Sequence, residues 1–394
     1  MIPALNKVDV VVLGASPTGL YVVRESARFG CRVAIADINP GCAFHSKFIA
    51  SDDRFEADLE SIEAWLLSFP EDVDKKPLLV PTSDVFIEFI IKKFRLLSSR
   101  FNVAQSYSGL ADKLLDKKQF HDLCAEFNVD TPGVWSAPDK QSLLSLLKEI
   151  PFPCLLKPTL IHRAREYLRG EKVLIARSSD EYIELVENMP DGLGGWLVQE
   201  IIPGPESEIT LFGAYMDSSG IPRQFFSARK LRQYPPGFGS ASLVSSQRCK
   251  ETERKSIDFL KSIGFQGICG AEFKLDSRDK KLKIIEINPR PTLWFQISYD
   301  AGKKIVSAMI ADLLDRDCPE EVSQNESVKW RYALKDAYSR FFYMRPPSNF
   351  VLPPGEIPPS NGSVKSSWPV FSFDDPRPAL FEPLGYLKKL WGRF

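Results

Sequence analysis

The sequence is poor in histidine and lacks paired cysteine motifs, long apolar runs and an excess of either charge. Its 51 Lys and Arg residues balance 51 Asp and Glu residues, so no global field attracts nucleic acid or an anionic membrane. Seven cysteines without a C-x-x-C pair and three histidines without ligand spacing argue against disulfide frameworks and metal–thiolate sites. The absence of about 18 consecutive apolar residues excludes a membrane-spanning helix, and no signal-peptide pattern opens the chain. These absences predict a cytoplasmic protein with reduced thiols.

A complete nucleotide-binding glycine motif is also missing. Residues 10–37 are typical of a buried strand, a glycine-containing turn, a helix and a second strand that ends at Asp37. A dinucleotide fingerprint requires G-x-G-x-x-G, but Ser16 stands at its second glycine and Pro17 removes an amide donor. A Walker loop is excluded because Leu20 stands where lysine is required. We expect a Rossmann-like turn without a nucleotide, and an NAD(P)-linked oxidoreductase is the alternative.

The pattern along the 394 residues divides the chain into three regions, in line with its length. Residues 1–107 alternate strands and helices, which predicts a mostly parallel sheet, whereas 108–330 favour an antiparallel α+β unit. Prolines crowd 331–394 beyond position 345 and exclude long helices there. The expected strands are 8–13, 32–36, 77–81, 196–200, 208–214, 268–275 and 282–288, and the expected helices are 20–29, 85–97, 118–127, 140–149, 180–188, 250–263 and 384–391.

The strongest chemical signal is the segment GICGAEFKLDSRDKKLKIIEINPRP. Two β runs flank the polar turn Asp276–Lys281 and predict a hairpin. Alternation places Glu272 roughly opposite Glu286, with Asn288 on the same face as Glu286. Like charges so placed destabilise a hairpin unless a hard cation lies between them, and carboxylate and amide oxygens suit Mg²⁺. Arg290 lies beside this cluster, where a guanidinium can bind phosphate. Ordinary half-exposed strand acids are the alternative interpretation.

On these residues the sequence resembles the ATP-grasp superfamily. The segment IEINPR, residues 285–290, is similar to the E-x-N-x-R motif of that superfamily, with Glu272 as the partner acid. Lys117 precedes a helix as the first nucleotide lysine does, and Lys157 in FPCLLKP resembles the second. The stretch WLVQEIIPGPESEI is similar to the hinge between lobes. The stretch ARKLRQYPPGFGSA resembles predicted carboxylate–amine ligases of this superfamily, including its D-aspartate ligase branch.

The resemblance implies an α/β and α+β protein. A Rossmann-like pre-ATP-grasp domain at 1–107 precedes a two-lobed ATP-grasp domain with antiparallel sheets at 108–330, hinged near 199–203, and a proline-rich extension at 331–394 follows. It implies ATP and Mg²⁺, with Mn²⁺ as an alternative ion. The implied metal ligands are Glu272, Glu286 and Asn288, the implied nucleotide contacts are Lys117, Lys157, Glu200, Ile201, Ile202 and Glu208, and the implied catalytic cations are Arg290, Lys230 and Arg229.

The reaction that the resemblance implies is amide formation. A substrate carboxylate attacks the γ-phosphorus of ATP to give an acyl phosphate, and an amine then displaces phosphate. The products are ADP, phosphate and an amide, and the partners are a small carboxylate and a small amine, with amino acids as the natural choice. A non-catalytic ATP-binding or scaffold protein is the alternative function.

Several assignments stay open at this level. Lys113 or Lys118 can replace Lys117, and Glu206 can replace Glu208 at the ribose. The cations of Arg229–Gln233 are either an anion clamp or a solvated face. Instead of a glycine-rich loop, the chain carries only Gly170 and the basic residues His162, Arg163, Arg165 and Arg169 at 159–171.

The loop 159–171 and the segment 234–242 are the expected lids over the phosphates. The proline-rich extension is expected to pack on the core. A role in a homodimer, or contact with a membrane surface through Trp391 and its neighbouring lysines, is the alternative for that extension.

Overall fold

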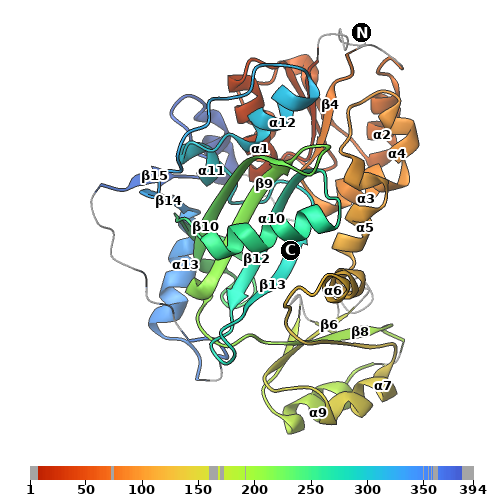
Figure 1. Cartoon of the computed structure of the whole chain (residues 1–394), viewed down its shortest axis with the longest axis vertical. Coiled ribbons are helices and arrows are strands. Elements are labelled where there is room, and N and C mark those ends of the chain that lie inside the picture. Colours follow the sequence, from red (N-terminus) through yellow and green to blue (C-terminus); the bar gives the residue numbers. More distant parts are fainter. Residues whose placement is uncertain are drawn as a thin grey trace.

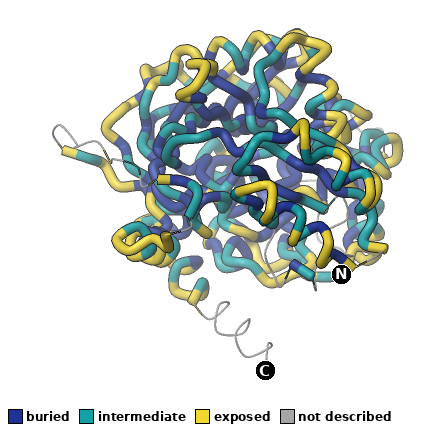
Figure 2. Tube along the Cα trace, turned by 90° about the horizontal axis from the view of Figure 1, so that it is seen from below, coloured by how far each residue is buried: buried dark blue, intermediate teal, exposed yellow. Residues whose placement is uncertain are grey.

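Three sheets organise the computed structural model, which describes residues 8–71, 75–158, 167–168, 173–190, 192–348, 350–353, 355, 357 and 363–383. Figure 1 shows the small sheet set apart at one end of the molecule, with the N-terminal sheet and a large central sheet packed together at the other. Buried segments gather inside these layers, and exposed residues follow the loops and outer helix turns (Figure 2). No helix among the described residues has the length and apolar character to cross a membrane.

A parallel sheet of order β3-β2-β1-β4 forms the N-terminal part. Its strands are β1 (Val10–Leu13), β2 (Val33–Asp37), β3 (Arg54–Glu56) and β4 (Leu78–Pro81), and its helices are α1 (Pro17–Arg28), α2 (Leu59–Leu67), α3 (Asp84–Lys92) and α4 (Phe94–Ser98). The predicted parallel α/β arrangement is therefore confirmed. The single helix expected at 85–97 is wrong, because the backbone at Lys93 leaves the helical region and divides it into α3 and α4.

The glycine turn after β1 is closed by protein atoms. A Cβ on Gly14 would lie 2.3 Å from Oγ1 of Thr82, and one on Gly19 would lie 1.9 Å from the carbonyl oxygen of Gly14. The Asp37 carboxylate accepts a hydrogen bond of 2.5 Å from the backbone amide of Ala15. These glycines therefore serve close packing, as expected for a turn that holds no dinucleotide.

The central sheet has the order β13-β12-β9-β10-β11-β14-β15. Its strands are β9 (Ile209–Met216), β10 (Pro222–Tyr234), β11 (Ser240–Ser246), β12 (Gly267–Leu275), β13 (Leu282–Asn288), β14 (Val328–Arg331) and β15 (Lys365–Ser367). The predicted β12–β13 hairpin forms, and Glu272 pairs with Glu286 in its register. The hairpin β10–β11 was not predicted, so the segment 234–242, expected as a loop, is a turn followed by the start of β11.

The small antiparallel sheet has the order β5-β8-β6-β7. Its strands are β5 (Val134–Ala137), β6 (Cys154–Pro158), β7 (Leu174–Ala176) and β8 (Trp196–Glu200), covered by α7 (Lys140–Ser145) and α9 (Ser179–Glu187). The helix expected at 140–149 is α-helical only to Ser145, and a 3₁₀ turn follows at Leu146–Lys148.

Apolar helices join the N-terminal sheet to the central one. Further helices are α5 (Leu110–Leu115), α6 (Lys117–Glu126), α10 (Lys250–Ser262), α11 (Gln296–Asp300), α12 (Ile305–Leu313) and α13 (Ala333–Met344). One buried cluster contains Val10 of β1, Leu20 of α1, Ile305 of α12 and Trp330 of β14. This shared core fixes the N-terminal part against the central sheet, since a close-packed interior resists relative movement.

The described part of the C-terminal extension packs on the core, as expected. Strand β15 pairs in parallel with β14, and Asp375 forms a buried ion pair with Arg24 of α1. Helix α13, which was not predicted, ends before the run of prolines. The helix expected at 384–391 lies outside the described residues.

Candidate active site

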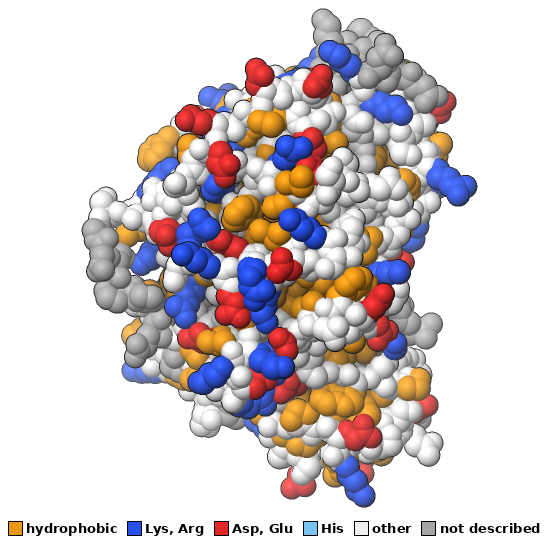
Figure 3. All heavy atoms as spheres, viewed as in Figure 1, with side chains coloured by type: hydrophobic (Ala, Val, Ile, Leu, Met, Phe, Trp, Pro, Cys, Tyr) orange, Lys and Arg blue, Asp and Glu red, His pale blue; other side chains and the backbone are white. Residues whose placement is uncertain are grey.

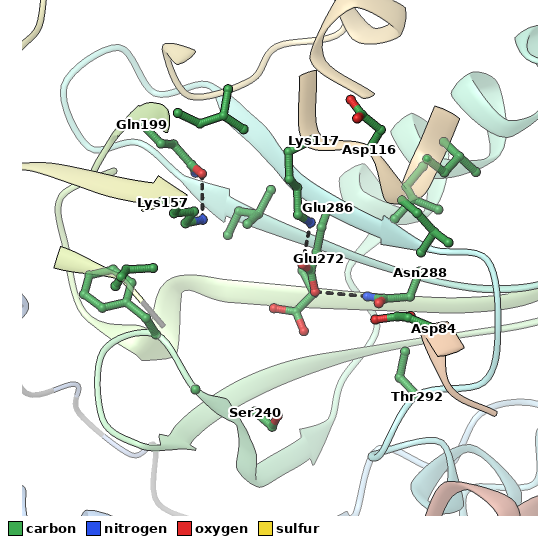
Figure 4. A pocket seen from close by; sticks show the side chains of 18 of the residues that line it. Asp84, Asp116, Lys117, Lys157, Gln199, Ser240, Glu272, Glu286, Asn288 and Thr292 are labelled. Atoms are coloured by element: carbon green, nitrogen blue, oxygen red, sulfur yellow. Dashed lines mark hydrogen bonds and ion pairs between the residues drawn. The ribbon is translucent and has the colours of Figure 1, made fainter. Parts of the chain in front are cut away.

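A cavity of about 1530 Å³ opens where the three sheets meet. Its walls come from the N-terminal part (Thr18, Ser83, Asp84), from helix α6 (Lys117), from the small sheet (Lys157, Gln199, Glu200) and from the central sheet (Lys230, Glu272, Lys274, Glu286, Asn288). Figure 4 shows Lys117, Glu272, Glu286 and Asn288 grouped on one side of the opening and Lys157 with Gln199 across it. Charged residues that are far apart in sequence thus face a common space.

The acidic pair on the β12–β13 hairpin is held by two lysines. Nζ of Lys230 lies 2.5 Å from Oε2 of Glu272, and Nζ of Lys117 lies 3.2 Å from Oε2 of Glu286. The side-chain amide of Asn288 donates to Oε1 of Glu286 at 3.0 Å (Figure 4). Of the lysines expected here, Lys117 is the one that pairs with Glu286. Lys118 also lines the cavity but pairs with Asp122, and Lys113 is not among the described lining residues, so the nucleotide contact of Lys117 stays a prediction.

The two carboxyls differ in their electrostatics. Burial raises the pKa of Glu272, although Lys230 opposes the change. Burial also opposes the ionisation of Glu286, but the charge of Lys117 and the amide of Asn288 outweigh it and lower its pKa to about 2. The pair thus carries more negative charge on Glu286, and a divalent cation would favour ionisation of both groups.

The donor set fits a hard cation. The described residues contain no group of three or more His, Cys, Asp or Glu side chains arranged for a metal ion. The candidate site consists instead of the carboxylates of Glu272 and Glu286 and the side-chain amide of Asn288. Oxygen ligands of this kind suit Mg²⁺, which usually keeps several waters and takes only one or two carboxylates from the protein.

Lys157 lies on β6, with its ammonium directed toward the cavity. Nζ donates to Oε1 of Gln199 at 2.9 Å. Burial lowers the pKa of Lys157 to about 8, helped by the charge of Lys117 and opposed by Glu286. Burying a charged ammonium beside a neutral amide costs free energy, and an anionic ligand such as a polyphosphate would offset that cost.

The expected hinge residues Glu200, Ile201 and Ile202 line the cavity. The carboxylate of Glu200 accepts a hydrogen bond of 2.9 Å from the amide of Gly133 and also pairs with Arg278. Its side chain is therefore already held by protein donors, which leaves its expected contact with an adenine amino group a prediction.

Lys274 is a further residue that lines the cavity, and no site role was predicted for it. Its Nζ donates hydrogen bonds of 2.8 Å to the carbonyl oxygens of Ile202 and Gly204, and burial lowers its pKa to about 8. It fixes the backbone where the chain leaves the small sheet. The signal was present, since Lys274 follows Glu272 by two positions and shares its face of β12.

The cations of Arg229–Gln233 separate when β10 forms. Lys230 faces the cavity. Arg229 instead pairs with Glu208 at 3.1 Å, and neither Arg229 nor Glu208 is among the described residues that line the cavity. Arg232 binds Asp336 of α13 through two hydrogen bonds of 2.7 and 2.9 Å. Of the expected segment Arg229–Gln233, Lys230 and Gln233 are the described residues that line the cavity, and Lys230 is the one cation among them.

Glu206, the alternative residue for the ribose contact, binds backbone amides of the protein instead of facing open space. Its buried carboxylate accepts hydrogen bonds from the amides of Gln233 at 3.0 Å and Gly237 at 2.5 Å. These bonds hold the β10–β11 turn, whose residues 237–241 line the cavity. The other expected lid, 159–171, lies outside the described residues apart from Tyr167 and Leu168.

Arg290 connects the site to the N-terminal part. Its Nε donates to Oδ1 of Asp84 at 2.8 Å, and Asp84 begins helix α3 at the carboxyl edge of the parallel sheet. Thr18 and Ser83 lie on the same side of the cavity. The cavity is thus lined by the cations of Lys117 and Lys157 and, from the N-terminal part, by hydroxyl groups and the Asp84–Arg290 ion pair.

Comparison with known proteins gives the same architecture. No family model matches the chain. It is 25% identical over 248 residues to the D-aspartate ligase of Enterococcus faecium (strain Aus0004), a match that covers 60% of this chain and 59% of that protein. N5-Carboxyaminoimidazole synthetase from Staphylococcus aureus complexed with ADP aligns with a TM-score of 0.61 and 14% identity, over 80% of this chain and 79% of that one. Biotin carboxylase from Campylobacter jejuni aligns with a TM-score of 0.59 and 13% identity, over 82% and 74%.

The chain spans about three fifths of the length of the ligase that it matches, and the similarity to the solved structures is one of fold. That fold unites a parallel N-terminal sheet, a small antiparallel sheet and a central antiparallel sheet that carries the acidic hairpin. The chain is thus similar in sequence to a D-aspartate ligase and in fold to N5-carboxyaminoimidazole synthetase and biotin carboxylase.

Proposed function

We propose that the protein is an ATP-dependent carboxylate–amine ligase that forms an amide through an acyl phosphate. The observation that carries this proposal is the pairing of Glu272 with Glu286 across the hairpin, in one cavity with Lys117, Lys157 and Lys230. Two carboxylates opposite each other on neighbouring strands repel and destabilise a sheet, and a bound cation would remove that repulsion. If that cation binds together with a triphosphate, the three lysines have a role as well, because they offset the negative charge of the phosphates.

The residues present fit both ATP and a divalent ion. Glu272, Glu286 and Asn288 would hold Mg²⁺, or Mn²⁺ in its place, and the ion supplies positive charge against the transferring phosphoryl group. Lys117 and Lys157 bind and orient the phosphates from two sides of the cavity. Ile201 and Ile202 supply the hinge contacts to the base, and Lys274 keeps that backbone in place.

Phosphoryl transfer is mainly a matter of positioning and charge stabilisation. The substrate carboxylate attacks the γ-phosphorus, the bond to the β-phosphate oxygen breaks, and ADP leaves. The amine then attacks the acyl carbon, the acyl C–O bond breaks with loss of inorganic phosphate, and the amine loses a proton. Lys230 and Arg290 neutralise the oxygens on which charge develops. Water must be excluded because an acyl phosphate hydrolyses readily.

The acid and the amine are proposed to bind at the end of the cavity that the N-terminal sheet forms. Thr18, Ser83 and Asp84 line that end together with Arg290, which offers hydroxyl, carboxylate and guanidinium groups to a small polar substrate. Amino acids have groups complementary to these, and the relative with 25% identity is a D-aspartate ligase. Amino acids are therefore the proposed substrate class.

The test is phosphate release from ATP across a matrix of carboxylates and amines, with new amides identified by mass spectrometry. The expected products are ADP, phosphate and one amide for a productive pair. AMP and pyrophosphate as products would contradict the acyl-phosphate route. ATP binding without ADP release for any pair would favour a non-catalytic ATP-binding protein.

A further inference from the structure

The C-terminal extension reaches the cavity, and among its described residues Leu352 contributes to the lining. Leu352 lines the cavity and is only 3% exposed. It forms one buried cluster with Leu155 of β6 and Ile201 of the hinge, with Val173 and Phe350 packed at the edge. The extension thus touches the strand that carries Lys157 and the segment proposed to contact the base.

The segment around Leu352 is held on both sides. The Phe350 ring lies 4.9 Å from the ring of Phe342 on α13, centroid to centroid, and its amide donates to the carbonyl of Pro347 at 3.0 Å. On the other side, a Cβ added to Gly237 would lie 3.2 Å from the Phe350 ring. Leu352 is therefore placed by α13 and by the β10–β11 turn that lines the cavity.

The ligand chemistry differs along the cavity. Lys117, Lys157 and Lys230 suit an anionic group, whereas Leu155, Ile201 and Leu352 offer apolar side chains to a flat ring. A nucleotide has this same division between its phosphates and its base. We propose that Leu352 forms one wall of the subsite for the base, so that the extension takes part directly in nucleotide binding; this inference rests on the proposed function.

The proposal has a thermodynamic consequence. If the base packs against Leu352, nucleotide binding and docking of the extension stabilise each other to the same degree, because coupling between binding events is reciprocal. ATP therefore protects the extension from proteolysis, and loss of the Leu352 side chain weakens ATP binding without changing the binding of phosphates alone.

Calorimetric titration of the full chain with ATP–Mg²⁺ and with inorganic tripolyphosphate–Mg²⁺ tests this. Leu352→Ala is expected to weaken ATP binding by roughly tenfold or more, since it removes several carbons from an apolar pocket, and to leave tripolyphosphate binding unchanged. Leu380→Ala is the matched control, because Leu380 belongs to the same extension and is 70% exposed. Leu352→Met, which keeps the volume, is expected to bind ATP nearly as the natural chain does.

The outcomes separate the two proposals. Unchanged ATP binding by Leu352→Ala, or equal losses for ATP and tripolyphosphate, overturns the role of Leu352 alone. Tighter ATP binding by Leu352→Ala overturns it too, since Leu352 would then obstruct the subsite and not form its wall. A natural chain that binds neither ligand overturns the proposed function together with this inference. Should Leu352→Ala fail to fold, proteolysis of the extension in the natural chain decides, with equal cleavage rates with and without ATP as the contrary result.

Discussion

Glu272 and Glu286 lie opposite each other on β12 and β13, and each carboxylate holds a lysine from a different element. Lys230 is 2% exposed at its side chain, whereas Lys117 is 40% exposed. The Glu272 pair is thus internal to the central sheet, and the Glu286 pair can open at the cavity. An incoming cation and triphosphate can therefore exchange partners at Glu286 with little disturbance of the fold.

The first prediction concerns the charge of Glu286. Glu286→Gln keeps the shape of the side chain but removes a negative charge from the proposed cation site. We expect ADP release to fall by at least about a hundredfold, the scale seen when one charge-stabilising group is lost. The melting temperature should change little, because the lysine that loses its partner is partly exposed. Steady-state ADP release and thermal unfolding measure the two quantities.

Asp258→Asn is the matched control for this change. Asp258 lies on α10 with an exposed side chain that pairs with Arg254, so the same chemical substitution there should leave ADP release unchanged. Retained activity in Glu286→Gln would contradict the proposed role of the acidic pair in cation binding, and with it the ligase proposal.

The second prediction is a pH dependence set by Lys157. Burial lowers its pKa to about 8, so its ammonium is charged below that pH and neutral above it. ATP binding should weaken as the pH rises through about 8, by at most about tenfold per pH unit for one proton. Calorimetric dissociation constants between pH 6.5 and 9.5, about 1.5 units either side of that pKa, measure it. Lys157→Arg stays charged and should give a flat profile; an identical slope in both proteins would assign the titration to another group.

The same shift affects stability in the opposite sense. The pKa of Lys157 is lower in the folded chain than its ordinary value, so above pH 8 the unfolded chain binds the additional proton. Stability from this group therefore rises with pH between the two pKa values. Weaker binding at high pH thus cannot be attributed to unfolding caused by Lys157.

Local patterns in the sequence predicted the hairpin at the centre of the site. The polar turn after Asp276 and the alternation on either side predicted both strands. The register from the turn pairs Phe273 with Ile284, and a β-bulge at Ile285, which no local pattern indicated, then brings Glu286 opposite Glu272. The partners of the cations on β10 come from elsewhere: Arg229 meets Glu208, and Arg232 meets Asp336 of α13. Such pairs depend on tertiary folding, so the run of cations did not indicate which of them would meet acids and which would face the cavity.

The extension shows the same limit. Its prolines predicted no long helix after position 345, whereas residues 377–383 are helical, and no local pattern indicates that Leu352 reaches the cavity. The glycine turn packs closely on Thr82, and its lack of a nucleotide, inferred from Ser16, stays a prediction. Sequence patterns thus gave strands and motifs, and the packing of distant segments decided which side chains meet.

The third prediction concerns Asp84, which holds Arg290 from the N-terminal part at 2.8 Å. Asp84 is 53% exposed, and it competes with any anionic substrate for the guanidinium. Asp84→Asn should lower the KM of the acid substrate or of ATP by about two- to fivefold, since a partly exposed ion pair contributes under about 1 kcal/mol. Arg290→Gln should raise KM and lower kcat. If Asp84→Asn behaves as Arg290→Gln does, Asp84 positions Arg290 and does not compete for it.

The fourth prediction separates the nucleotides. ATP with Mg²⁺ at about 100 times its Kd should add about 2.7 kcal/mol to the free energy of unfolding, seen as a rise in melting temperature. NADH should give no rise, because Asp37 already binds the amide of Ala15 and protein atoms fill the space around Gly14 and Gly19. Stabilisation by NADH alone would instead favour the oxidoreductase interpretation.

The fifth prediction uses two neighbouring aspartates of the extension, each paired with an arginine of α1. Asp375 and Arg24 have side chains 0% and 1% exposed, whereas Asp374 and Arg28 have side chains 46% and 20% exposed. Asp375→Ala leaves a buried guanidinium without its carboxylate and should cost about 3–5 kcal/mol of unfolding free energy. Asp374→Ala should cost under about 1 kcal/mol, because water replaces the lost partner.

Denaturant unfolding of both variants measures the difference. Lys and Arg are interspersed with Asp and Glu on the face shown in Figure 3 and balance over the chain, so the measurement is made away from neutral pH, where a net charge opposes association. Because Lys47 and Ser46 also donate hydrogen bonds to the Asp375 carboxylate, Asp375→Asn should recover part of the loss. Equal effects at the two positions would mean that the extension is not docked through Asp375. The buried pair would then contribute nothing to holding the segment that follows β15.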